Sequence, residues 1–113
     1  MSIQTLAGFI PEWFTPESQE KETKPARFKI APLSTFDLLD MVGLVNTGRI
    51  VNRTEMVAIL RRCLIDWDGV EDAQNKPLEC KEDNFAFLPL DTMNEVCERI
   101  GKISNVSEDD RKN

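Results

Sequence analysis

The sequence predicts a mainly α fold: a small single-domain bundle of three to four helices with a short N-terminal strand or extended arm. Its 113 residues suffice for one hydrophobic core and leave no room for a second. Several stretches carry apolar residues at three- and four-residue spacing, which is the period of an amphipathic helix. Each apolar stripe is narrow and one-sided, so we expect the helices to pack on one another.

Residues 1–24 are expected to form a flexible N-terminal arm, and residues 105–113 a polar C-terminal tail. Prolines interrupt the apolar part of the arm, and a polar run without periodicity follows it. Trp13 and Phe14 belong to that apolar part. These aromatic side chains either fold back over the core of the domain or form a short docking motif that orders on a partner.

The domain itself is expected to span residues 25–104 and to begin with a short strand at residues 26–30. Alternation of apolar and basic residues puts Phe28 and Ile30 on one face of this strand. Pro32 ends it, because a proline cannot donate a backbone hydrogen bond.

A first helix is expected to follow, with Ser34 or Thr35 as its N-cap. Asp37 in the first turn complements the helix dipole. The helix continues to about Val45, and residues 46–49 have the composition of a turn.

The second helix has the most regular pattern in the chain. Asn52 and Glu55 form a capping-box-like pair at its start. Arg61 and Arg62 lie off its apolar stripe, and a solvated basic face explains them better than a recognition site. The stripe ends at Trp67 and consists of Met56, Ile59, Leu60, Cys63, Leu64 and Trp67.

An acidic loop is expected over residues 68–80, with Gly69 and Asn75 among its turn residues. A short strand around Leu78 is an alternative for part of this loop. The loop contains no periodic pattern that would predict a longer element.

Two further helical segments are expected before the C-terminal tail. Asn84 can cap one short turn at Phe85–Leu88, which the following proline ends. Asp91 or Thr92 then starts a last helix that runs to Ile103. Its apolar stripe consists of Met93, Val96, Cys97, Ile100 and Ile103.

Catalytic chemistry has little support in the residues. The chain contains no histidine and no tyrosine, and it lacks a Gly-rich phosphate loop, so we expect neither enzymatic activity nor a cofactor. Asp66 and Asp68 are a carboxylate pair, but acidic residues where a helix turns into a loop are usually solvated. Counted from Asp66, the run also lacks the glycine and the glutamate that a calcium loop needs at its sixth and twelfth positions.

Three cysteines, Cys63, Cys80 and Cys97, are spread singly along the chain. An odd number without pairs does not make a disulfide framework, so we expect reduced, structural thiols. Without histidine or a Cys-x-x-Cys pair, a zinc site is not expected either.

The acidic balance limits the possible partners. A net charge of −6 argues against binding to nucleic acid or to an anionic membrane through a basic patch. Carboxylates interleave with lysines and arginines, which disfavours a mimic of DNA. No membrane span or secretory signal is recognised, so we expect a cytosolic protein.

The order of several short motifs resembles the tail assembly chaperones of long-tailed bacteriophages. The resemblance covers nearly the whole chain and rests on order and spacing. The helix that ends in a Trp–acidic–Gly segment and the acidic tail are its most specific parts. The motifs are Gly8–Trp13, Pro25–Lys29 with Pro32–Ser34, Asp66–Val70, Lys76–Leu78, Asn84 with Leu88 and Pro89, and Ser107–Asn113.

This resemblance implies a non-enzymatic protein whose residues 25–104 form a helical chaperone domain. Members of the family are thought to keep the long, apolar tape measure protein soluble while tail tube subunits polymerise around it. The implied partners are therefore the tape measure protein and, for forms with a C-terminal extension, the tail tube protein. The implied location is the host cytoplasm, and the mature virion is expected to lack the chain.

Large aromatic side chains are the candidate partner-binding residues, because a groove that holds an apolar helix needs apolar anchors. For Trp67 and Phe85, ordinary core packing is the alternative. Self-association is also open, because a core of this size leaves a small stability surplus. Two other functions stay open: a small acidic phage or prophage regulator of a host protein, and a minor structural tail component. The candidate anchors are Trp13, Phe14, Trp67, Phe85 and Phe87.

Overall fold

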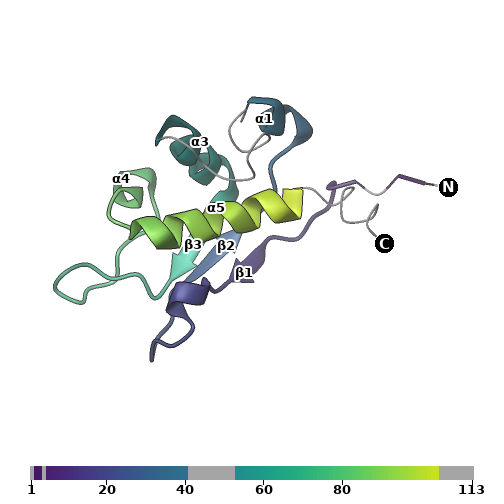
Figure 1. Ribbon diagram of the computed structural model, residues 1–113. Coiled ribbons are helices and arrows are strands. Elements are labelled where there is room, and N and C mark those ends of the chain that lie inside the picture. Colours follow the sequence, from purple (N-terminus) through teal and green to yellow (C-terminus); the bar gives the residue numbers. More distant parts are fainter. Residues whose placement is uncertain (1, 4, 41–52, 105–113) are drawn as a thin grey trace.

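A three-stranded antiparallel sheet with strand order β1-β2-β3 forms one layer of the protein, next to α5 (Figure 1). The structure is a computed structural model, and it describes residues 2–3, 5–40 and 53–104. The middle strand is the one that the alternating sequence pattern predicts. The strands are β1 (Glu12–Phe14), β2 (Arg27–Ile30) and β3 (Leu64–Asp68).

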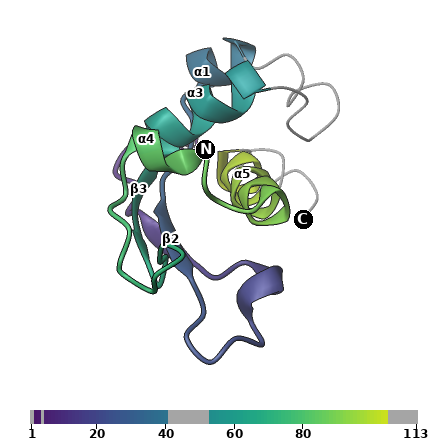
Figure 2. The same cartoon turned by 90° about the vertical axis from the view of Figure 1, so that its left-hand side faces the viewer.

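The helices cover one face of the sheet and one of its ends. Figure 2 shows α5 alongside the sheet as a second layer, with α3 and α4 above both. A single 3₁₀ turn, η1, precedes β2 and contacts α5. The helical elements are η1 (Glu17–Gln19), α1 (Thr35–Asp40), α3 (Arg53–Cys63), α4 (Glu82–Phe85) and α5 (Leu90–Ser104).

The fold is therefore a small α/β domain, and the expected bundle of three to four helices is wrong. In the described part of the chain, four helices accompany the sheet, and two of these have fewer than seven residues. The expected short N-terminal strand is confirmed. Phe28 and Ile30 share its buried face, and both are 0% exposed.

The second helix ends four residues earlier than expected, and this shortening completes the sheet. α3 stops at Cys63, and the next residues pair with β2 as strand β3. A bulge explains why the sequence pattern looked helical. Leu64 pairs with Ile30 and Trp67 with Phe28, while the register shifts by one residue between them. Leu64 and Trp67, three residues apart, therefore both face inward, as they would on a helix.

The core forms where α3 and α5 meet the inner face of the sheet. Phe28 and Trp67, which are paired across β2 and β3, pack edge to face with ring centroids 6.3 Å apart. The apolar stripes of both long helices point into this core, as their spacing predicts. The hydrophobic core residues that are at most 1% exposed are Phe28, Ile30, Leu33, Ile59, Leu60, Cys63, Val96, Cys97 and Ile100.

The start of α1 agrees with the sequence. The Ser34 hydroxyl accepts a hydrogen bond of 3.1 Å from the backbone N–H of Asp37, as an N-cap does. The expected continuation to Val45, the turn at 46–49 and the Asn52 cap lie outside the described residues. The polar tail at 105–113 lies outside them as well.

The last two helices differ from expectation mainly at their starts. α4 begins at Glu82, so the expected cap at Asn84 is wrong; the Asn84 side-chain amide instead donates 2.7 Å to the Glu79 carbonyl. α5 confirms the last helix. At its end, the Ser104 hydroxyl accepts from the Leu33 N–H at 2.8 Å and donates to the Ile100 carbonyl. This buried contact ties α5 to the segment that follows β2.

Part of the expected N-terminal arm belongs to the sheet. β1 pairs with β2 over its three residues, and the Arg99 guanidinium of α5 donates 2.8 Å to the Glu12 carboxylate. The backbone N–H of Ser18 also donates to the Glu95 carboxylate, at 3.2 Å. These contacts differ from the flexible arm that the sequence predicts for residues 1–24.

Candidate partner-binding groove

Three helices enclose an apolar groove of about 720 Å³. α3 forms one wall, α4 with the turn after it forms the second, and the first turns of α5 form the third. Some apolar side chains of α3 and α5 are only partly covered by the core: Met56, Val57 and Met93 are half-buried, and Leu90 is exposed. The apolar lining consists of Met56, Val57 and Leu60 from α3, Phe85 and Ala86 from the α4 region, and Leu90 and Met93 from α5.

The groove has a buried floor and an accessible mouth. Leu60 is 1% exposed and Phe85 is 7% exposed, so both form the floor. Met56 and Met93 are half-buried on opposite walls. Leu90 is 65% exposed at the mouth. Methionine side chains are flexible and polarisable, and they adapt to varied apolar partners.

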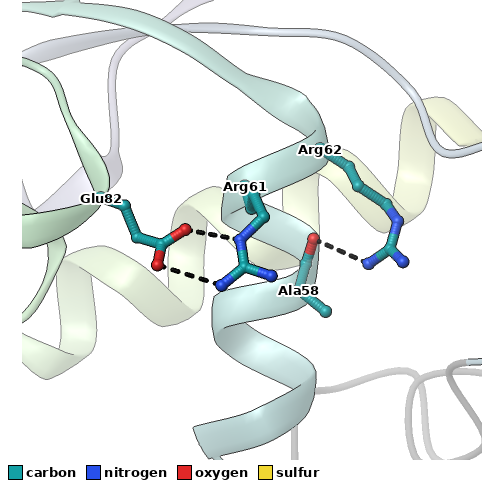
Figure 3. Close-up of polar contacts among 4 residues, drawn as sticks. All are labelled: Ala58, Arg61, Arg62 and Glu82. Atoms are coloured by element: carbon teal, nitrogen blue, oxygen red, sulfur yellow. Dashed lines mark hydrogen bonds and ion pairs between the residues drawn. The ribbon is translucent and has the colours of Figure 1, made fainter.

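An arginine–carboxylate pair holds α4 against α3. Figure 3 shows the Arg61 guanidinium directed at the Glu82 carboxylate, with two hydrogen bonds; that from Nη2 is 3.0 Å long. Hydrogen bonding to Arg61 lowers the pKa of Glu82, and the same contact raises the pKa of Arg61. The pair is exposed, so its main consequence is the position of α4 beside the groove.

The neighbouring Arg62 connects α3 in the other direction. Its guanidinium donates 3.2 Å to the Ala58 carbonyl one turn earlier (Figure 3) and lies 3.2 Å from the Asp37 carboxylate of α1. Arg61 and Arg62 are both exposed, as the sequence predicts for a basic face, but each has a partner from another helix.

Two of the five aromatic candidates are buried in the core rather than exposed as surface anchors. Trp67 and Phe85 are each 7% exposed, and their rings pack edge to face with centroids 6.0 Å apart. The core-packing alternative describes their location. Phe85 still contributes to the groove, because its ring is part of the floor.

The other three aromatic candidates do not gather at one place. Trp13 is 42% exposed and pairs with Lys29, so it lies on the sheet face opposite Phe28; the Arg27 guanidinium stacks 4.7 Å from its ring centroid. Phe14 packs against the core. Phe87 is 73% exposed in the turn after α4.

The residues that make the groove walls are not among the binding residues that the sequence predicts. Met56 and Met93 were assigned to the stripes of their helices and expected in the core, and Leu90 was not considered. One available signal was the position of Leu90, an apolar residue directly after Pro89 and at the start of an amphipathic helix. Such a residue lies beside the stripe and tends to be left at a surface.

Three carboxylates of β3 and the acidic loop form local contacts that stabilise this part of the fold. Asp66 accepts a hydrogen bond of 2.8 Å from the Trp67 N–H, and Asp68 pairs with Arg27 at 2.9 Å. Asp72 accepts from the N–H groups of Gln74 and Lys76, which closes the turn. Within residues 2–3, 5–40 and 53–104, no group of three or more His, Cys, Asp or Glu side chains could hold a metal ion.

The three thiols are unpaired in this structure. Burial raises the pKa of Cys63 and of Cys97 to about 12, and that of Cys80 to about 11. Thiols with such pKa values stay protonated near neutral pH and are poor nucleophiles.

None of the protein-family models, curated proteins and solved structures compared with the chain matches it. Among the described helices, none has both the length and the apolar character that crossing a bilayer requires.

Proposed function

We propose that this chain is a non-enzymatic tail assembly chaperone that holds an apolar helix of a phage tape measure protein in the groove between α3, α4 and α5. The single observation that carries this proposal is the groove itself, with its apolar floor and an exposed leucine at its mouth. The family resemblance of the sequence supplies the identity of the client.

The shape of the groove favours a helical client. The walls are mainly helical, and beyond the first turn of each helix the backbone groups bond within that helix, so the groove offers mostly side chains to a client. A client must therefore satisfy its own backbone hydrogen bonds, as a helix does, and present apolar anchors at three- and four-residue spacing.

A chaperone of this kind needs only moderate affinity for its client. A chaperone that holds a client must also release it when tube subunits arrive. Micromolar binding, about −8 kcal/mol, is adequate if many copies line one long client chain. The net charge of −6 helps loaded complexes repel one another. On this proposal the chain acts in the host cytoplasm during virion assembly.

Co-expression with the tape measure protein tests the proposal. The wild-type chain should raise the soluble yield of the client and co-purify with it. Leu90→Gln removes an apolar contact at the mouth of the groove and should weaken binding about tenfold, the equivalent of one partly buried leucine. Leu39→Gln is the matched control, because Leu39 is 68% exposed on α1 and does not line the groove.

Three results would contradict the proposal. The first is an unchanged client yield with no co-purification. The second is an equal loss of binding in both leucine variants, which would point to a general effect of polar substitution. The third is a mass spectrum of purified virions that contains the chain in stoichiometric amount, which would make it a structural component.

A further inference from the structure

The rim of the groove is charged at both ends, with opposite signs. Arg53, the first residue of α3, lies at one end of the groove. Glu82 and Asp83, in the first turn of α4, lie at the other. Glu82 bonds to Arg61, which is eight residues after Arg53 on the same helix. At a rise of 1.5 Å per residue, Arg53 and the Arg61–Glu82 pair are therefore separated by about 12 Å along α3, and Asp83 follows Glu82 directly in α4.

Two of these rim charges are available to a partner. Both Arg53 and Asp83 are exposed, and neither forms an ion pair with another residue in the described part of the chain. Glu82 differs, because Arg61 already engages both of its carboxylate oxygens. Within residues 2–3, 5–40 and 53–104, an occupant of the groove therefore meets an unpaired cation at one end and an unpaired carboxylate at the other.

We infer that the preferred occupant of this groove is an amphipathic helix with opposite charges at the two ends of its apolar stripe. A basic residue would face Asp83, and an acidic residue about eight positions away would face Arg53. This inference rests on the proposed helix-holding function and specifies the client segment that the groove selects.

The rim charges contribute more to the choice between client helices than to the strength of binding. Ion pairs at an exposed rim are weak, so we expect each matched pair to tighten binding by about two- to fivefold at low salt. The apolar stripe would supply most of the affinity. The preference should shrink as salt is added, because exposed charges are screened.

Three synthetic helical peptides with the same apolar stripe can test the inference. The first carries Lys at one end and Glu at the other, the second carries Lys at both ends, and the third carries Glu at both ends. A fourth peptide with a scrambled stripe reports non-specific binding. Their dissociation constants for the full 113-residue chain are measured by fluorescence anisotropy.

The Arg53→Glu variant makes the test specific to the rim. The wild-type chain should bind the Lys–Glu peptide about two- to fivefold tighter than the di-Glu peptide. In the Arg53→Glu variant both ends of the rim are acidic. This variant should therefore bind the di-Lys peptide about two- to fivefold tighter than the Lys–Glu peptide. Lys102→Glu on α5 is the control, because it changes the net charge equally and does not line the groove.

Three other results would contradict the inference, and each points to a different explanation. If Arg53→Glu and Lys102→Glu shift the peptide preferences equally, rim selection is wrong while the helix-holding function stands. If the peptides with the apolar stripe bind no better than the scrambled peptide, rim selection and the helix-holding function are both wrong. If sedimentation shows a dimer that Leu90→Gln dissociates, a second copy of this chain occupies the groove instead.

Discussion

The indole nitrogen of Trp67 donates a hydrogen bond of 2.7 Å to the backbone carbonyl of Leu78. This bond joins strand β3 to the segment that leads into α4. The ring of Trp67 then packs against Phe85, the floor of the groove. One buried side chain thus connects the sheet to the groove through a hydrogen bond and a ring contact.

Substitution of Trp67 should reduce stability. Trp67→Phe leaves the Leu78 carbonyl without its donor and should lower the free energy of unfolding by about 1–3 kcal/mol. Trp67→Ala also opens a cavity and should cost about 3–5 kcal/mol. Urea unfolding followed by circular dichroism measures both. Trp13→Phe is the matched control and should cost less than about 1 kcal/mol, since Trp13 is 42% exposed.

Gly69 should tolerate alanine poorly. Its φ of +77° is costly for a residue with a side chain, about 1–2 kcal/mol. A Cβ atom would also lie 3.0 Å from the Pro25 carbonyl oxygen and 3.2 Å from the Ala26 Cα. Gly8 has the same φ with no atom within 4 Å of such a Cβ. Gly69→Ala should therefore destabilise more than Gly8→Ala in urea unfolding, and equal effects would contradict the close approach.

Alkaline pH should destabilise the fold through its buried thiols. The pKa of Cys97 is raised from 9.0 to about 12 by burial, with smaller contributions from Cys63 and Glu98. Above pH 9 the unfolded chain releases this proton while the folded chain keeps it. The stabilising effect of the buried thiol is therefore complete below pH 9 and is lost as the pH rises to about 12.

The slope of stability against pH measures this effect. Each proton released only on unfolding lowers the free energy of unfolding by about 1.4 kcal/mol per pH unit. Cys97→Ala should flatten the curve above pH 9 by about that slope, whatever its effect at neutral pH. An identical slope in the wild type and the variant would show that Cys97 does not keep its proton.

The sequence predicted those elements that depend on local pattern. In α5 the buried residues recur with the period of a helix, and in β2 they alternate as in a strand. Both elements form where the sequence predicts them. The N-cap at Ser34 is a contact between neighbours in the chain, so it too could be predicted. In each of these cases the residues that decide the structure lie within a few positions of one another.

The sheet was missed because its pairing is long-range. The register Phe28 with Trp67 joins residues 39 positions apart, and the bulge at Ile65 gives β3 the three-residue spacing of a helix. β1 has only three residues, too few for a period to be recognised. The groove was missed for a related reason. Its walls come from three separate helices, and their surface was counted as core.

Methyl NMR of methionine tests the central claim, that the groove holds the client helix, most directly. Met56 and Met93 line opposite walls of the groove, so their labelled methyl groups report on its occupancy. Titration with an apolar helical segment of the tape measure protein should shift both signals along one saturable curve, and Leu90→Gln should move that curve to higher concentration. A segment that binds while both methyl signals keep their positions would contradict the account.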